Sequence, residues 1–145
     1  MWKLHVLSSA DQSAQVAVVP AYQGRVMTSS ASSNQGMSLG WINRNPIASD
    51  QRVPHINAFG GEDRFWMGPE AGQFSIFFKQ DDPFDLEHWQ TPAPIDTEPY
   101  PIVKKTKNQI TFKKNFKLTN YSGTIFSIDL QRKIKLLSRA NVAAT

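Results

Sequence analysis

The sequence predicts an all-β fold, an antiparallel β-sandwich, and three features of the chain predict it. Apolar and polar residues alternate with a period of two over residues 110–119 and again over residues 126–136. Turn-forming residues at 120–123 separate these two runs. Shorter apolar runs, bounded by glycine, proline and polar clusters, are typical of further strands and cover residues 15–19, 24–30 and 38–42.

The last third of the chain has the clearest strand pattern. In its first run the apolar residues of one parity are Ile110, Phe112, Phe116 and Leu118, and polar residues take the other parity. The same alternation from Phe126 to Leu136 predicts a second strand, so the two runs form a long hairpin with one buried face. Most lysines of this region have the polar parity, and we therefore expect them on the solvent face.

The middle of the chain contains one strongly apolar run and one long irregular stretch. Residues 74–78 (FSIFF) predict a central strand that is buried on both faces. Residues 80–103 contain five prolines, which predict a long loop. Its aromatic residues Phe84, Trp89 and Tyr100 favour a loop that packs against the core.

A chain of 145 residues with 40% hydrophobic residues is sized for one domain with a real core. We therefore predict a single β domain over residues 1–145. Within it we expect a flexible N-terminus at 1–14, the long Pro-rich loop at 80–103 and a flexible tail at 138–145.

Composition and charge exclude several classes of protein. No stretch reaches the 18 or more apolar residues of a membrane-spanning helix, and the absence of cysteine excludes disulfides and thiolate ligands. Residues 1–103 carry six Lys/Arg and eleven Asp/Glu, whereas residues 104–145 carry ten Lys/Arg and one acid, Asp129. Because the hairpin pattern explains the basic residues as a solvated face, we do not expect a nucleic-acid partner.

Residues 55–70 (HINAFGGEDRFWMGPE) form the densest group of chemically useful side chains. The pair Gly60 and Gly61 predicts a tight corner that another segment or a ligand approaches closely. Carboxylates and guanidinium groups bind sugar hydroxyls, and an indole offers an apolar face to a sugar ring. The candidate substrate-binding residues are accordingly Asn57, Glu62, Asp63, Arg64, Trp66 and Glu70.

A purely structural role for the same segment is the alternative. In that interpretation Arg64 pairs with Glu62 or Glu70, and Phe65 and Trp66 fill the core. Residues 55–70 contain neither a phosphate-binding loop nor a dinucleotide fingerprint, and the three histidines lack metal-ligand spacing. We therefore expect no metal and no cofactor.

The segment NAFGGEDRFWMGPEAGQFSIFF, preceded by GRVMTSSA and GWINRNPI, resembles uncharacterised bacterial proteins related to the galactose-mutarotase-like superfamily. The resemblance covers residues 15–137, and its pattern residues are Gly60, Gly61, Trp66, Pro69 and Glu70. It implies part of, or a reduced form of, a β-supersandwich that binds a sugar across a concave sheet. Such proteins are typically much longer and place their catalytic acid and histidine largely in the later half, so the resemblance implies an incomplete catalytic set.

The leading hypothesis is a carbohydrate-binding protein in the periplasm or outside the cell, although no intact signal peptide is present in residues 1–9. An alternative is a sugar epimerase or a small hydrolase, with His55 and Glu70 as candidate catalytic residues. Another is a module that binds polyanions through Lys104, Lys105, Lys107, Lys113, Lys114 and Lys117. Because an incomplete sandwich exposes a sheet face or edge, we also expect a homo-oligomer.

Overall fold

The computed structural model describes residues 3–138 and 142–143. In chain order the elements are β1 (His5–Ser8), β2 (Gln15–Val19), the 3-10 helix η1 (Pro20–Tyr22), β3 (Arg25–Ser30), α1 (Arg44–Ser49), α2 (Ala93–Asp96), β4 (Ile102–Lys105), β5 (Gln109–Thr119) and β6 (Ile125–Lys135). The strands form two three-stranded antiparallel sheets, in the orders β1-β2-β3 and β4-β5-β6. The predicted all-β, sandwich-like fold is confirmed.

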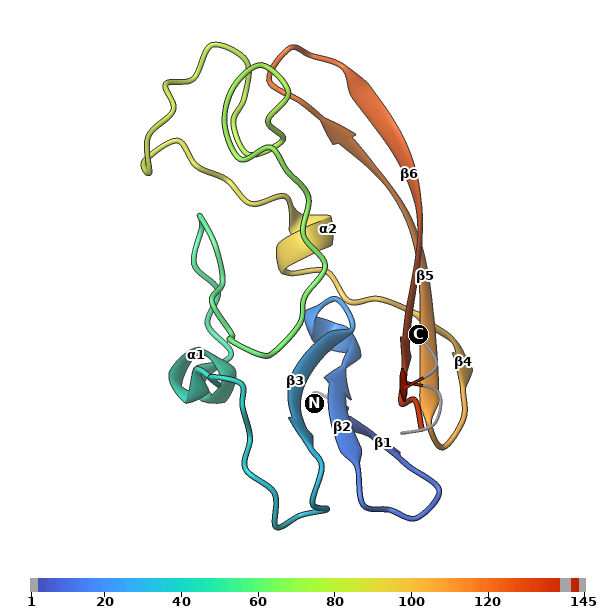
Figure 1. Ribbon diagram of the computed structural model, residues 1–145. Coiled ribbons are helices and arrows are strands. Elements are labelled where there is room, and N and C mark those ends of the chain that lie inside the picture. Colours follow the sequence, from blue (N-terminus) through green and yellow to red (C-terminus); the bar gives the residue numbers. More distant parts are fainter. Residues whose placement is uncertain (1–2, 139–141, 144–145) are drawn as a thin grey trace.

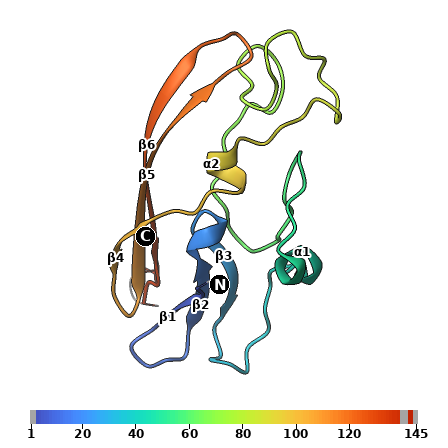
Figure 2. The same ribbon diagram turned by 180° about the vertical axis from the view of Figure 1, so that it is seen from behind.

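The two sheets share one hydrophobic core. Leu7, Val18 and Val26 of the first sheet pack with Ile110 and Phe112 of the second. Figures 1 and 2 show the first sheet beside the lower half of the long β5–β6 hairpin, with α2 above it. The upper half of the hairpin extends past the first sheet and leaves a second surface for the irregular middle of the chain (Figure 1).

The first sheet starts earlier in the chain than the sequence pattern predicts. The strands expected at 15–19 and 24–30 correspond to β2 and β3. Residues 1–14, expected as a flexible N-terminus, contain β1, which pairs along its whole length with β2. Leu7 is fully buried and His5 is nearly so. Four residues with two inward side chains are too short a run to stand out from the sequence, yet pairing satisfies the backbone groups that face β2.

A carboxylate organises the turn between β1 and β2. Asp11 accepts hydrogen bonds from the hydroxyls of Ser9 and Ser13 and from the Ser13 backbone N–H. These hydrogen bonds lower the pKa of Asp11 from its ordinary value to about 2.

An NMR titration of the side-chain carboxyl carbons is expected to give Asp11 a midpoint near pH 2. Because the folded pKa is depressed, the stabilisation from these hydrogen bonds is present above the unfolded pKa and is lost as the pH falls through about 2. A midpoint for Asp11 equal to that of a model peptide would contradict the turn geometry.

The predicted hairpin is confirmed with continuous register. All residues of β5 pair with β6, from Gln109 opposite Lys135 to Thr119 opposite Ile125. The exposed lysines of the polar parity are Lys113, Lys117, Lys133 and Lys135. Lys114 belongs to the opposite face and forms an ion pair of 2.7 Å with Glu98. Most of the basic hairpin is thus a solvated face, as expected.

Two predicted strands are absent from the described structure. Residues 38–42 form no strand, and the side chains of Leu39 and Trp41 are largely exposed. Residues 74–78 are also irregular, because Ser75 bonds through its carbonyl to the Tyr121 N–H and through its hydroxyl to the Glu70 carbonyl. These hydrogen bonds satisfy the buried polar groups without a neighbouring strand, so an apolar run of five residues remains a loop.

The predicted long loop packs against the core, as its aromatic residues indicate. Trp89 stacks on Phe77 with ring centroids 4.5 Å apart, and Phe84 lies 4.8 Å from Tyr121. Tyr100 is buried. The loop contains the short helix α2, and β4 begins at Ile102, one residue before the predicted end of the loop. The predicted flexible tail at 138–145 falls mostly outside the described residues.

Candidate functional site

The Gly-Gly corner is tight because two other segments touch its backbone. Gly60 and Gly61 have φ angles of +79° and +106°. The Gly61 N–H donates to the Trp41 carbonyl at 2.7 Å, and the next N–H donates to the Val26 carbonyl at 2.8 Å. A Cβ on Gly60 would lie 2.2 Å from the Trp41 oxygen. The predicted corner is confirmed, and it is filled by the chain itself.

Arg64 leaves this corner and turns its guanidinium inward. Its Nη2 donates to the Ile95 carbonyl at 2.8 Å and lies 3.8 Å from Asp96 Oδ1. Burial lowers the pKa of Arg64, and the negative charge of Asp96 acts in the opposite direction. The alternative pairing of Arg64 with Glu62 or Glu70 is wrong, because α2 brings a different carboxylate to the guanidinium.

The indole of Trp66 contacts other protein groups through its ring and through its nitrogen. The guanidinium carbon of Arg64 lies 4.2 Å from the indole ring, and Phe77 stacks on the ring with centroids 5.1 Å apart. The indole Nε1 donates to Glu70 Oε1 at 3.0 Å. The π surface that a sugar ring would need therefore contacts protein groups.

Asn57 is a buried bridge between two loops. Its Nδ2 donates to Asp96 Oδ2 at 2.7 Å and to the Val53 carbonyl at 3.1 Å, while its Oδ1 accepts from the Val53 N–H at 3.0 Å. Its own backbone N–H also donates to Asp96. The contacts of Asn57 are internal, and its side chain is closed to solvent.

The remaining predicted residues also have protein partners. Glu62 accepts hydrogen bonds from the backbone and hydroxyl of Ser29 in β3. Asp63 pairs with Arg132 of β6. His55 Nδ1 lies 2.6 Å from the Trp89 carbonyl oxygen. Through these contacts the segment 55–70 connects β3, β6 and the loop that contains Trp89.

A buried cation lies beside the corner, and the sequence pattern does not single it out. Arg25 is 2% exposed and donates from Nη1 to the Gly60 carbonyl at 2.8 Å. Its Nε and Nη2 have no acceptor within the described part of the chain. Burial, and secondarily the positive charge of Arg64, lower the pKa of Arg25 to about 10. As the first residue of a strand, an arginine gives no signal of such burial in the sequence.

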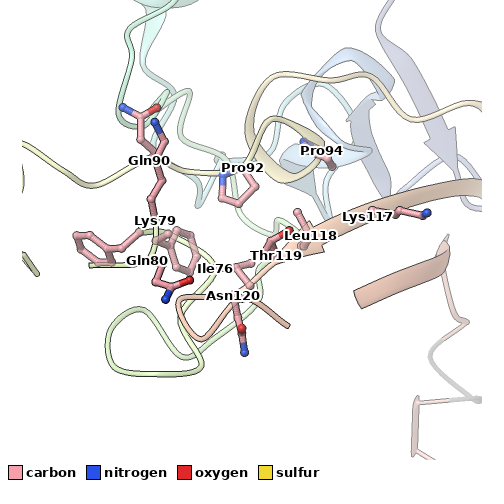
Figure 3. Close-up of a pocket in the computed structure, with 13 residues that line it drawn as sticks. Ile76, Lys79, Gln80, Gln90, Pro92, Pro94, Lys117, Leu118, Thr119 and Asn120 are labelled. Atoms are coloured by element: carbon pink, nitrogen blue, oxygen red, sulfur yellow. The ribbon is translucent and has the colours of Figure 1, made fainter. Parts of the chain in front are cut away.

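A hollow with a volume of about 460 Å³ lies at the far end of the hairpin, beside Phe77 and the indole rings of Trp66 and Trp89 that stack on it. Three segments line it, namely residues 76–80, the stretch from Gln90 to Pro94 and the end of β5 with its turn. Figure 3 shows Ile76, Pro92 and Leu118 close to one another and Lys117 pointing away from them. Its walls are therefore apolar where the three segments meet.

Polar groups surround these apolar walls. The amides of Gln80 and Gln90 are exposed and make no hydrogen bond within the described part of the chain, and Lys79 and Lys117 make no ion pair there. An amide donates and accepts hydrogen bonds at the same time, so these groups suit a ligand rich in hydroxyls. The sequence pattern assigns the lining residues to strands or to a loop, and it gives no signal that they meet.

Across residues 3–138 and 142–143, no three His, Asp or Glu side chains are close enough together to hold a metal ion. In the same described residues, no helix has the length and hydropathy needed to span a membrane.

A family model matches this chain over residues 2–145. Its description is a family of unknown function, DUF6786. The chain belongs to this family. No curated protein and no solved structure matches the chain. Family membership thus covers the two sheets, the corner and the hollow alike, and it assigns no activity to any of them.

Proposed function

We propose that this protein binds carbohydrate in the hollow at the end of the hairpin, on a fold related to the galactose-mutarotase-like sandwiches. The observation that carries the proposal is the combination, in one hollow of about 460 Å³, of apolar walls with unpaired side-chain amides. Ligand sites in proteins have this size and this mixture of surfaces. The amides of Gln80 and Gln90 would bind hydroxyls, and Phe78 with Pro92 would contact the C–H face of a sugar.

In this proposal, the segment 55–70 supports the part of the hollow's wall that contains Phe77. Trp66 stacks on Phe77, which lines the hollow, and Arg64 lies over the Trp66 ring. The sequence predicts Arg64, Trp66 and Glu70 as direct sugar contacts. Because their side chains already have protein partners, we assign them the role of holding Phe77 in place.

The positions of the histidines favour a protein that binds a sugar without catalysing a reaction on it. His55 is engaged with the Trp89 carbonyl, and His88 lies 2.7 Å from Asp85, which raises the pKa of His88. Neither histidine lines the hollow. An epimerase needs an acid and a base within reach of the same sugar. A glycan ligand also agrees with the predicted periplasmic or extracellular location.

The double variant Gln80→Ala with Gln90→Ala is expected to lose glycan binding at least tenfold, because each amide supplies hydrogen bonds that a methyl group lacks. The measurement is a screen of the wild-type protein on immobilised glycans, followed by calorimetric titration of any glycan retained. Gln51→Ala is the matched control, since Gln51 is exposed and lies outside the hollow.

Two outcomes would overturn the proposal. The first is a wild-type protein that retains no glycan in the screen. The second is equal loss of binding in the control and in the double variant, because that result would place the ligand away from the hollow.

A further inference from the structure

The outer edge of β6 carries a row of free backbone groups. β6 is the last strand of the β4-β5-β6 sheet and pairs only with β5 in the described chain. At the two ends of the hairpin, Asn120 N–H donates to the Thr124 carbonyl and Leu136 N–H donates to the Asn108 carbonyl. Antiparallel pairing alternates along a strand, so the even-numbered residues of β6 bond to β5 and the odd-numbered ones point outward.

Such an edge pairs with another strand unless side chains prevent it. An exposed lysine is one of the devices that block edge pairing. β6 has Lys133 and Lys135 on this edge, but it also has Asp129, which is the only acid in residues 104–145. An approaching strand with a negative charge opposite Lys133 and a positive charge opposite Asp129 would be accepted. β6 itself is such a strand.

We propose that two copies of this chain pair antiparallel through their β6 edges, with Gln131 on the two-fold axis. In this register Asp129 lies opposite Lys133 of the other copy, and the symmetry repeats the pair. Both residues are odd-numbered, so their free backbone groups face each other. Opposite charges at directly opposed positions stabilise a strand pair, and like charges destabilise it.

The apolar side chains fit the same register. Ile125 is 65% exposed and Leu137 is 50% exposed, and they lie opposite each other across the edge. On the other face, Ile128 lies opposite Ile134. The exposed Ile125 and Leu137, and the half-buried Ile128, gain burial when the two copies meet.

Neighbouring registers match less well. A register that keeps each face of the sheet continuous moves its centre by a whole residue. Centring on Leu130 places Lys133 opposite Ser127 and leaves the charges unpaired. Centring on Arg132 gives Asp129 a lysine partner, but it sets the two Arg132 side chains opposite each other. The proposed register is therefore the one favoured by charge.

Sedimentation velocity of the full chain over a range of concentrations tests the proposal. The wild-type protein is expected to form a dimer, and D129K or K133D is expected to weaken it by roughly tenfold, or about 1.4 kcal/mol, because each places two like-charged pairs in the interface. The double variant D129K/K133D restores the opposite charges and is expected to dimerise as the wild type does. An equimolar mixture of the two single variants is expected to form the heterodimer, which also shows that both are folded.

K113D is the matched control. Lys113 is exposed on the same face of the same sheet, but it lies in β5, which pairs with β6 on one side, and its own backbone N–H donates to the Pro101 carbonyl on the other. Its substitution is expected to leave the dimer unchanged. A wild-type protein that stays monomeric at all concentrations would overturn the proposal, as would single variants that dimerise like the wild type or a K113D variant that weakens the dimer equally.

Discussion

Replacing Gly60 with alanine is expected to lower the free energy of unfolding by about 3 kcal/mol or more. Part of the loss is conformational, because a φ of +79° costs a residue with a Cβ about 1–2 kcal/mol. The larger part is steric, since the new Cβ would lie 2.2 Å from the Trp41 carbonyl oxygen. That oxygen is held in place by the Gly61 N–H at 2.7 Å. Urea denaturation followed by tryptophan fluorescence measures the change.

Gly72→Ala separates the two contributions. Gly72 has a similar φ of +86°, but nothing lies within 4 Å of the position that a Cβ would take, so only the conformational cost applies. We expect a loss of about 1 kcal/mol for this variant. Equal losses at Gly60 and Gly72 would show that the close approach of the Trp41 backbone contributes little.

The sequence predicts those parts of the fold in which strands are long and consecutive strands pair with each other. The alternation over 110–119 and 126–136 predicts both strands of the hairpin and the exposure of Lys113 and Lys133, because one face of a two-stranded ribbon must be buried. The same alternation does not predict β1, because four residues contain too few alternations to be recognised.

Local sequence pattern does not predict the irregular middle of the chain, because the contacts there connect residues that are distant in the sequence. The side chains of Asn57 and Asp96 meet across 39 positions, and Arg64 reaches the carbonyl of Ile95 across 31. Local pattern carries no information on contacts of this kind. The strand predicted at 74–78 is also wrong, because other segments supply its hydrogen-bond partners. The Ser75 carbonyl accepts from the Tyr121 N–H in the hairpin turn, the Phe77 carbonyl accepts from the Gln90 N–H, and the Ser75 hydroxyl donates to the nearby Glu70 carbonyl.

The candidate site is likewise predicted in part by local sequence and in part only by contacts between distant residues. Residue density alone draws attention to 55–70, and the structure brings Arg64, Trp66 and Glu70 together there. The hollow instead joins Gln80, Gln90 and the end of β5, three places that no spacing rule links. The sequence thus locates the supporting group, and only the fold locates the open space beside it.

Asp96→Ala is expected to destabilise the protein by about 3–5 kcal/mol, the range found when one partner of a buried charged pair is removed. Asp96 is 2% exposed and accepts hydrogen bonds from the backbone and side chain of Asn57. It is also the carboxylate that lies 3.8 Å from the Arg64 guanidinium. Its loss leaves buried donors without an acceptor and a largely buried positive charge without compensation.

Asp96→Asn distinguishes the charge from the hydrogen bonds. The asparagine retains one oxygen for the Asn57 donors, whereas it removes the negative charge near Arg64. We expect roughly half of the alanine effect, because the Arg64 Nη2 keeps its hydrogen bond to the Ile95 carbonyl. Urea denaturation measures both variants, and an alanine variant within about 1 kcal/mol of the wild type would contradict a structural role for this carboxylate. Since Arg64 also lies over Trp66, whose ring stacks on Phe77 in the wall of the hollow, loss of Asp96 is expected to loosen that wall as well.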